Sequence, residues 1–239
     1  LKNGVYPTAA NQAQDFEVLV DGSNVVQSIC TLNGMVVFTV FNPIDFKPVL
    51  NVLSGPGQFG SDNVCGSTRR YSFNYTTTTQ AKRIAAVNFL DQIPVGYYVV
   101  AMNLANVNPA LDTYVSTWMD DTLALGSGNS LYHRLKNAGF LEIDSFNRPR
   151  AFNFIYKKQD NSFIPVYKMS QGTTDKVVLD LICPSIKGSG TITSPLYGPA
   201  VSWSQFHWRG KPLETTPGDS VSFKVIGVTA AGAETTLYT

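Results

Sequence analysis

Charged residues are scarce in this chain, and neither sign dominates. Asp, Glu, Lys and Arg make up 15% of its 239 residues, and the formal net charge at pH 7 is +1. A nucleic-acid-binding surface needs clustered Lys and Arg, and a solvated acidic region needs a large excess of Asp and Glu. The composition therefore disfavours a nucleic-acid partner and an acidic disordered tail.

Cysteine is also rare. Cys30, Cys65 and Cys183 are the three cysteines, and none has the CxxC spacing that zinc sites and many redox sites use. We therefore expect no metal site and no cofactor. Three buried thiols are favoured, but a Cys30–Cys65 disulfide that leaves Cys183 over stays open if the protein is exported.

Long apolar runs are absent. No stretch reaches the roughly 18 apolar residues that a membrane-spanning helix needs, so we expect no membrane span. The start, LKNGVYPTAA, lacks the charged-then-apolar layout of a signal peptide and does not begin with Met. Together with the strand-like ending GAETTLYT, these features predict a fragment of a longer, exported protein.

Residue sets that carry catalysis are not apparent either. Cys183 follows an apolar strand, where burial explains a thiol better than nucleophilic chemistry does. His133 lies on a predicted helix, and His207 is expected to face solvent from a strand. Asp120 and Asp121 are adjacent and so point apart on a helix, which does not suit the paired carboxylates of a glycosidase. We predict no catalytic residue and a protein that is not an enzyme.

What the chain does contain is a succession of apolar strands and amphipathic helices. Strands are expected at 15–20, 25–30, 33–41, 69–75, 97–104, 151–158 and 163–169. Helices are expected at 80–93 and 131–138, and the segment 106–125 is expected to be partly helical. The strand at 33–41 is a continuous apolar run, which indicates burial on both faces, and Gly139 stands where a helix commonly ends.

The last third of the chain reads as strands alone. They are expected at 177–183, 191–200, 202–210, 220–230 and 235–239, with turns at 217–218 and 231–232. This pattern is typical of a small all-β module, such as part of a sandwich or a jelly roll. The predicted fold class is therefore α+β, with an α+β domain over 1–172 and a β-sandwich-like module over 173–239.

One resemblance concerns the order of elements in the first domain. A helix that ends in Ile93-Pro94-Val95-Gly96 precedes the strand YVVAMNL, and the helix LYHRLKNAGF precedes a strand that ends in Lys157-Lys158. Over residues 34–167 this order resembles the ILEI/PANDER-like domain. The resemblance implies a mixed sheet with packed helices, in a fold that supports sugar recognition in at least one enzyme stem domain.

A second resemblance covers residues 70–239. The pairing of SLYHRLKNAGFLEIDSFNRPRAFNFIYKK with the later GTITSPLYGPAVSWSQFHWRG looks like the large Bacteroidetes surface proteins that travel through the type IX secretion system. This resemblance implies an extracellular or cell-surface location. Some such proteins are sortase-like and carry a gingipain-type cysteine peptidase domain elsewhere, but the contexts of His133 and His207 match no peptidase motif, so no catalytic residue is transferred.

Carbohydrate recognition is the best-motivated function for such a region. Sugar sites combine aromatic faces with planar polar groups, and Trp118, Tyr132, Arg148 and Arg150 are the candidate ligand-binding residues. A solvated or salt-bridged role for the two arginines stays open. We hypothesise a non-catalytic recognition region whose partner is a polysaccharide or a neighbouring domain of the same chain. The alternatives are part of a cysteine-peptidase-type secretion protein and a purely structural spacer.

Overall fold

A computed structural model of the chain describes residues 1–4, 16–26, 34–51, 58–61, 71–104, 109–173, 175–184, 191–202, 204–207, 209 and 221–238. The chain divides into two compact units, which we call unit 1 (Leu1–Ile186) and unit 2 (Lys187–Thr239). The sequence placed the boundary after residue 172. It lies later because β9 (Lys176–Val178) pairs with β1 (Lys2–Gly4), and this pairing attaches the segment after 172 to unit 1.

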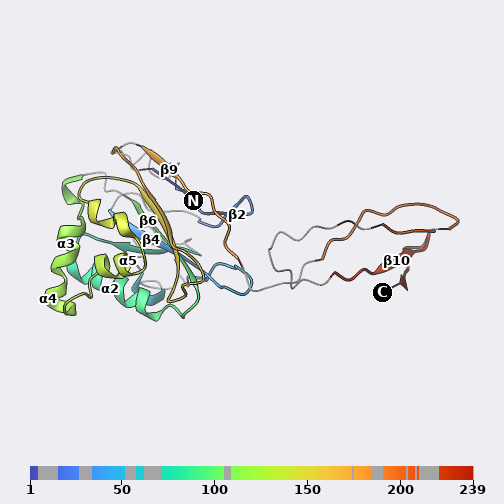
Figure 1. Cartoon of the computed structure of the whole chain (residues 1–239), viewed down its shortest axis with the longest axis horizontal. Coiled ribbons are helices and arrows are strands. Elements are labelled where there is room, and N and C mark those ends of the chain that lie inside the picture. The colour runs from blue at the N-terminus through green and yellow to red at the C-terminus, as the bar shows by residue number, and fades with distance from the viewer. Residues whose placement is uncertain are drawn as a thin grey trace. The chain divides into compact units, whose positions relative to one another are not determined.

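Unit 1 is built on a five-stranded antiparallel sheet with the strand order β5-β4-β6-β7-β8 (Figure 1). The strands are β4 (Met35–Phe41), β5 (Phe73–Thr76), β6 (Tyr98–Leu104), β7 (Phe152–Lys157) and β8 (Val166–Met169). Four of them lie within segments that the sequence predicted as strands, and β5 extends one residue beyond the predicted 69–75. Two short strands, β2 (Leu19–Val20) and β3 (Ser23–Asn24), form a hairpin outside this sheet.

Helices cover one face of the sheet (Figure 1). They are α2 (Gln80–Gln92), α3 (Val115–Asp120), α4 (Thr122–Leu125) and α5 (Leu131–Asn137), with 3-10 turns η2 (Gln58–Gly60), η3 (Pro109–Leu111) and η4 (Leu141–Ser145). The two helices predicted from apolar spacing are confirmed as α2 and α5. Gly139 follows α5 with a φ of +103°, a value that glycine adopts at little cost. The α+β class is therefore confirmed. The mixed sheet that the first resemblance implied is wrong for the described strands, because each pairing in the five-stranded sheet is antiparallel.

The apolar strands bury side chains on both faces of the sheet. All seven residues of β4 are buried, as its uninterrupted apolar run predicted. Because side chains alternate along a strand, Val36 and Phe38 alternate with Met35 and Val37 between two separate cores. The first core lies under the helices, and the second lies under residues from 16–26 and 179–183.

A buried ion pair joins α2 to the α3–α4 junction. The Arg83 guanidinium donates to both carboxylate oxygens of Asp121 at 2.7 and 2.8 Å, and to the carbonyl oxygen of Thr77 at 2.7 Å. Arg83 is 4% exposed and Asp121 is 1% exposed. Both charges are thus removed from water, and their pairing with good geometry offsets the cost of desolvation.

The outer edge of β5 is bonded by polar side chains from another part of the chain. The Ser61 hydroxyl accepts from the backbone N–H of Asn74 at 2.9 Å and donates to the carbonyl oxygen of the same residue at 3.3 Å. The Asn51 amide donates to the carbonyl oxygen of Ser72 at 2.7 Å. These side chains therefore take the place that a neighbouring strand would occupy.

Unit 2 differs from the predicted module. Its described residues contain one hairpin, β10 (Val225–Val228) paired with β11 (Glu234–Tyr238), and no strand within 191–202. Large apolar side chains in this unit are exposed, including Ile192 at 91% and Leu196 at 80%. A sandwich needs a second sheet to bury its inner face. The described part of unit 2 therefore does not bear out the predicted sandwich.

Candidate ligand-binding groove

A surface groove of about 730 Å³ lies in unit 1 where α2, α5 and the β7–β8 connection meet. Its lining comes from the last turns of the two helices and from the chain between Tyr156 and Pro165. The lining residues are Leu90, Asp91, Arg134, Asn137, Ala138, Tyr156, Lys157, Lys158, Gln159, Asp160, Asn161, Phe163, Ile164 and Pro165. A concave site of this size is sufficient for a small ligand.

One wall of the groove is held by a charge pair between the two helices. The Arg134 guanidinium on α5 donates to both carboxylate oxygens of Asp91 on α2, at 2.8 and 3.0 Å. A third nitrogen of Arg134 donates to the side-chain oxygen of Asn129 at 3.0 Å. Bidentate geometry fixes the orientation of the guanidinium plane, so this wall is preorganised.

Lys158 anchors the base of the groove to the end of α2. Its ammonium donates to the carbonyl oxygens of Leu90, Asp91 and Ile93 at 2.5, 2.8 and 2.6 Å. These carbonyl groups end a helix, where a cation is stabilising. Burial lowers the pKa of Lys158, but all three ammonium protons are engaged in these bonds. Lys158 thus acts as a structural clamp and not as a free amine.

The connection from β7 to β8 carries a second charge pair. The Lys157 ammonium lies 2.7 Å from a carboxylate oxygen of Asp160, and the other oxygen accepts from the backbone N–H of Ser162 at 2.9 Å. The bond to Lys157, followed by the donors of Ser162, lowers the pKa of Asp160 to about 2. Asp160 is therefore ionised at neutral pH and is not a general acid.

Close backbone packing sets the position of this connection. A Cβ atom added to Gly139 would lie 2.7 Å from Cγ of Pro165, closer than real contacts allow. The glycine that ends α5 therefore also lets the β7–β8 connection approach the helix. Local helix termination and the shape of the groove thus depend on the same residue.

The polar groups left available in the groove are neutral amides. Asn137, Gln159 and Asn161 are exposed, and within the described part of the chain their side chains have no hydrogen-bond partner. Ile164, 81% exposed, adds an apolar surface. Since the charged groups of the lining are paired with one another or with helix carbonyls, the arrangement suits an uncharged polar ligand.

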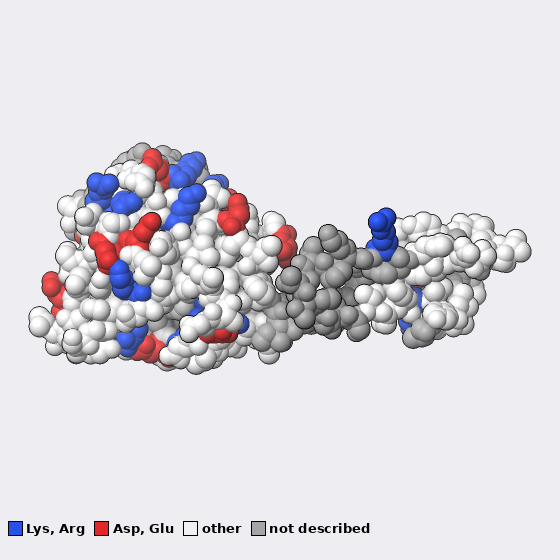
Figure 2. All heavy atoms as spheres, viewed as in Figure 1, with Lys and Arg blue, Asp and Glu red and all other residues white. Residues whose placement is uncertain are grey.

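Charges elsewhere on unit 1 are also of mixed sign. On the face shown in Figure 2, Lys and Arg side chains alternate with Asp and Glu side chains over unit 1. No large field of one sign is visible on that face to attract a polyanion or a polycation.

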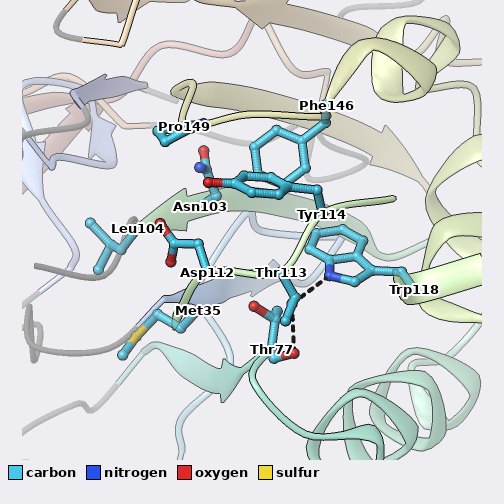
Figure 3. A pocket seen from close by; sticks show the side chains of 10 residues that line it. All are labelled: Met35, Thr77, Asn103, Leu104, Asp112, Thr113, Tyr114, Trp118, Phe146 and Pro149. Atoms are coloured by element: carbon cyan, nitrogen blue, oxygen red, sulfur yellow. Dashed lines mark hydrogen bonds between the residues drawn. The ribbon is translucent and has the colours of Figure 1, made fainter. Parts of the chain in front are cut away.

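Trp118, a candidate sugar-binding residue from the sequence, belongs to the core. It is 1% exposed and packs against Phe146 with a ring-centroid distance of 5.4 Å. Its indole N–H donates to the Thr113 hydroxyl at 3.0 Å, in the wall of a small pocket (Figure 3). The Trp118 ring is therefore not available to stack on a sugar. Met119 on the same helix is 42% exposed.

Arg150 is a structural residue as well. It is 7% exposed, and it donates to the Ser170 carbonyl oxygen and to the carbonyl and hydroxyl oxygens of Ser145, the latter two at 3.2 and 3.1 Å. It thus ties η4 to the end of β8. Arg148 is exposed and donates to the carbonyl oxygen of Gln171 at 3.1 Å.

Tyr132 is half-buried, and its hydroxyl donates to Asp144 at 2.7 Å. Lys136 donates to the same carboxylate, and these two bonds lower the pKa of Asp144. Neither Tyr132 nor the two arginines line the groove. The structure therefore does not gather the four candidates from the sequence around one cavity.

The reactive groups considered from the sequence have structural environments. The Ser130 hydroxyl lies 2.8 Å from Nδ1 of His133, but Ser130 is fully buried and accepts from the His133 backbone N–H as the N-cap of α5. Cys183 is half-buried, and burial raises its pKa to about 11. His207 is exposed, as predicted, but it does not lie in a strand. Cys30 and Cys65, with their possible disulfide, lie outside the described residues.

A comparison with protein-family models finds no match to this chain, and curated protein sequences give none either. Among the described residues, no group of His, Cys, Asp and Glu has the arrangement of a metal site, and no helix is long and apolar enough to cross a membrane. The function is therefore inferred from the chemistry of the groove.

Proposed function

We propose that this chain is a non-catalytic recognition region of a large exported bacterial surface protein, and that it binds a neutral oligosaccharide segment in the groove of unit 1. The observation that carries the proposal is the set of three exposed amides, Asn137, Gln159 and Asn161, in a groove whose charged groups are otherwise engaged. Amides both donate and accept, which matches the hydroxyls of a sugar.

The groove also has the rigidity that binding requires. The Asp91–Arg134 pair fixes the two helices, and Lys158 fixes the chain that follows β7. Because these contacts exist without a ligand, little conformational entropy is lost when a ligand binds. The extracellular or cell-surface location and the ILEI/PANDER-like assignment come from the sequence resemblances and stay predictions.

A glycan array with the full 239-residue chain, followed by calorimetric titration of the glycans that bind, tests this function. Neutral polysaccharides are expected to bind better than sulfated or uronic-acid polymers. Asn161→Ala is expected to weaken binding about tenfold, because one polar partner is lost at about 1 kcal/mol or slightly more. The combined Asn137→Ala, Gln159→Ala and Asn161→Ala variant is expected to abolish it.

Asn147→Ala is the matched control, because Asn147 is an exposed asparagine outside the groove. It is expected to bind as the parent does. The proposal would be contradicted if the folded chain bound no glycan on the array, or if the triple variant still bound the glycans that the parent binds. The former result favours a spacer. Peptide hydrolysis abolished by Cys183→Ala would instead favour the peptidase alternative.

A further inference from the structure

A small, partly open pocket of about 10 Å³ lies in unit 1 apart from the groove (Figure 3). It sits where β4 begins, β6 ends and the segment before α3 crosses them, and Met35, Leu104, Asp112 and Tyr114 are among its lining residues. Its polar and apolar walls come from segments far apart in the sequence.

The Tyr114 hydroxyl is the pocket's unusual feature. This oxygen is buried, and no described residue donates to it or accepts from it. The ring itself is well fixed, because it packs edge-on against Phe146 at a centroid distance of 5.4 Å. A buried hydroxyl without a partner is costly, and native proteins usually satisfy such groups with protein or with an ordered water.

The other polar groups of the wall are already engaged with the protein. The Asn103 amide donates to the Arg150 carbonyl oxygen and accepts from the Phe152 N–H, each at 2.7 Å. The Thr77 carbonyl oxygen accepts from the Thr113 hydroxyl at 2.7 Å. These groups therefore define the walls and do not reach the Tyr114 oxygen.

Asp112 supplies an acceptor beside that hydroxyl. The Tyr114 hydroxyl and the Asp112 carboxylate both point toward the Asn103 and Leu104 side of the pocket (Figure 3). Burial, and then the charge of Asp112, raise the pKa of Tyr114 to about 12. The phenol is thus protonated at neutral pH and is able to donate. A carboxylate has about four lone-pair sites, so Asp112 can accept from a further donor in addition to its other contacts.

We infer that the pocket binds one ordered water molecule, which accepts from the Tyr114 hydroxyl and donates to the Asp112 carboxylate. The volume decides the class of ligand, because a pocket of about 10 Å³ has room for one water and for nothing larger. The water thus bridges two side chains of the segment that leads into α3. This inference is independent of the proposed function of the groove.

The stability of Tyr114→Phe distinguishes a hydroxyl that is bonded to a water from a hydroxyl that is buried without a partner. If the hydroxyl binds a water, its removal is expected to increase the unfolding equilibrium constant about tenfold, as the loss of a satisfied buried hydrogen bond does. Tyr75→Phe calibrates the scale, because the Tyr75 hydroxyl donates to the Phe59 carbonyl oxygen at 2.8 Å. A Tyr114→Phe variant that is as stable as the parent, or more stable, would overturn the inference.

A crystal structure of the parent chain provides a test that needs no variant. At a resolution that shows ordered solvent, one water is expected within hydrogen-bond distance of the Tyr114 oxygen and the Asp112 carboxylate. Density for that water supports the inference. A pocket closed by a direct bond between Tyr114 and a protein group, or one without solvent density, refutes it.

Discussion

The two units differ in what happens to their apolar side chains. Phe89 in unit 1 is 1% exposed and contacts three other aromatic rings within 5.4 Å. Phe206 in unit 2 is 63% exposed, although its ring contacts Phe223 at 5.0 Å. Apolar character alone is therefore not sufficient to bury a side chain. It is buried where another element supplies the opposite surface.

The cause lies in the connections between strands. In unit 1 the chain places α2 between β5 and β6, and α3 to α5 between β6 and β7, so helices reach the sheet and cover it. In unit 2 the described residues place only a turn between β10 and β11. A two-stranded hairpin without a covering layer is marginal on its own.

Truncating one phenylalanine in each unit is the most direct test of this difference in burial. Phe89→Ala is expected to cost about 3–5 kcal/mol of unfolding free energy, because it removes a ring from a packed core. Phe206→Ala is expected to cost less than about 1 kcal/mol, since an exposed ring loses one aromatic contact at most. Scanning calorimetry of the whole chain measures both. Similar losses would mean that unit 2 also buries its aromatic side chains.

Removing the charge of Asp121 tests whether the core of unit 1 depends on its ion pair. Asp121→Asn is expected to destabilise unit 1 by about 3 kcal/mol, because the Arg83 charge is left buried with a neutral partner. In a Trp203→Phe, Trp208→Phe background, Trp118 is the one remaining tryptophan and reports unfolding of unit 1. The exposed neighbour Asp120, changed to Asn, is the control and should leave the urea midpoint unchanged. Equal stability of the two variants would show that the buried pair contributes nothing.

A methyl group at Gly139 tests the close approach beside the groove. Gly139→Ala is expected to cost about 2 kcal/mol, from the positive φ and from the clash with Pro165 together. Gly96→Ala isolates the backbone cost, because Gly96 has a φ of +84° and open space around its Cβ position. The same tryptophan fluorescence, in urea, measures both. If Gly96→Ala costs as much as Gly139→Ala, then the contact with Pro165 adds nothing to the loss.

The pH dependence of Asp160 gives the smallest effect. Its pKa is lowered from 3.8 to about 2 in the folded chain, so its charged form stabilises the fold. This contribution is fully present above about pH 4 and is lost as the pH falls toward 2. In Lys157→Met, the NMR titration midpoint of the Asp160 carboxyl is expected to rise toward 3.8. Lys168→Met should leave it unchanged, and a midpoint that stays low in Lys157→Met would assign the shift to Ser162.

The sequence was sufficient to predict the main elements of unit 1. Apolar spacing located α2 and α5, and continuous apolar runs located β4 and β6. These predictions succeed because the order of apolar residues within one segment reflects which of its faces are buried. The same reasoning failed for the segment 191–200. This segment was predicted as a strand, but a strand also needs a partner, which one segment cannot reveal.

The site was harder to predict than the fold. Trp118 and Arg150 are residue types common in sugar sites, yet which face of α3 is covered, and what lies beside Ser170, are tertiary facts. The groove joins residues near 91, 134 and 160, and no short motif marks such a set. The available sequence signal for the groove was Asn161, a polar residue that follows the predicted strand 151–158 with its two terminal lysines.

The bonds of Ser61 and Asn51 to the outer edge of β5 have a consequence for how copies of the protein behave together. The N–H and C=O groups of Asn74, and the C=O group of Ser72, are already occupied. An edge in this state offers no template on which a second molecule can add a strand, which is how many β-rich proteins start to aggregate. Two small polar side chains thus protect this side of the sheet against self-association.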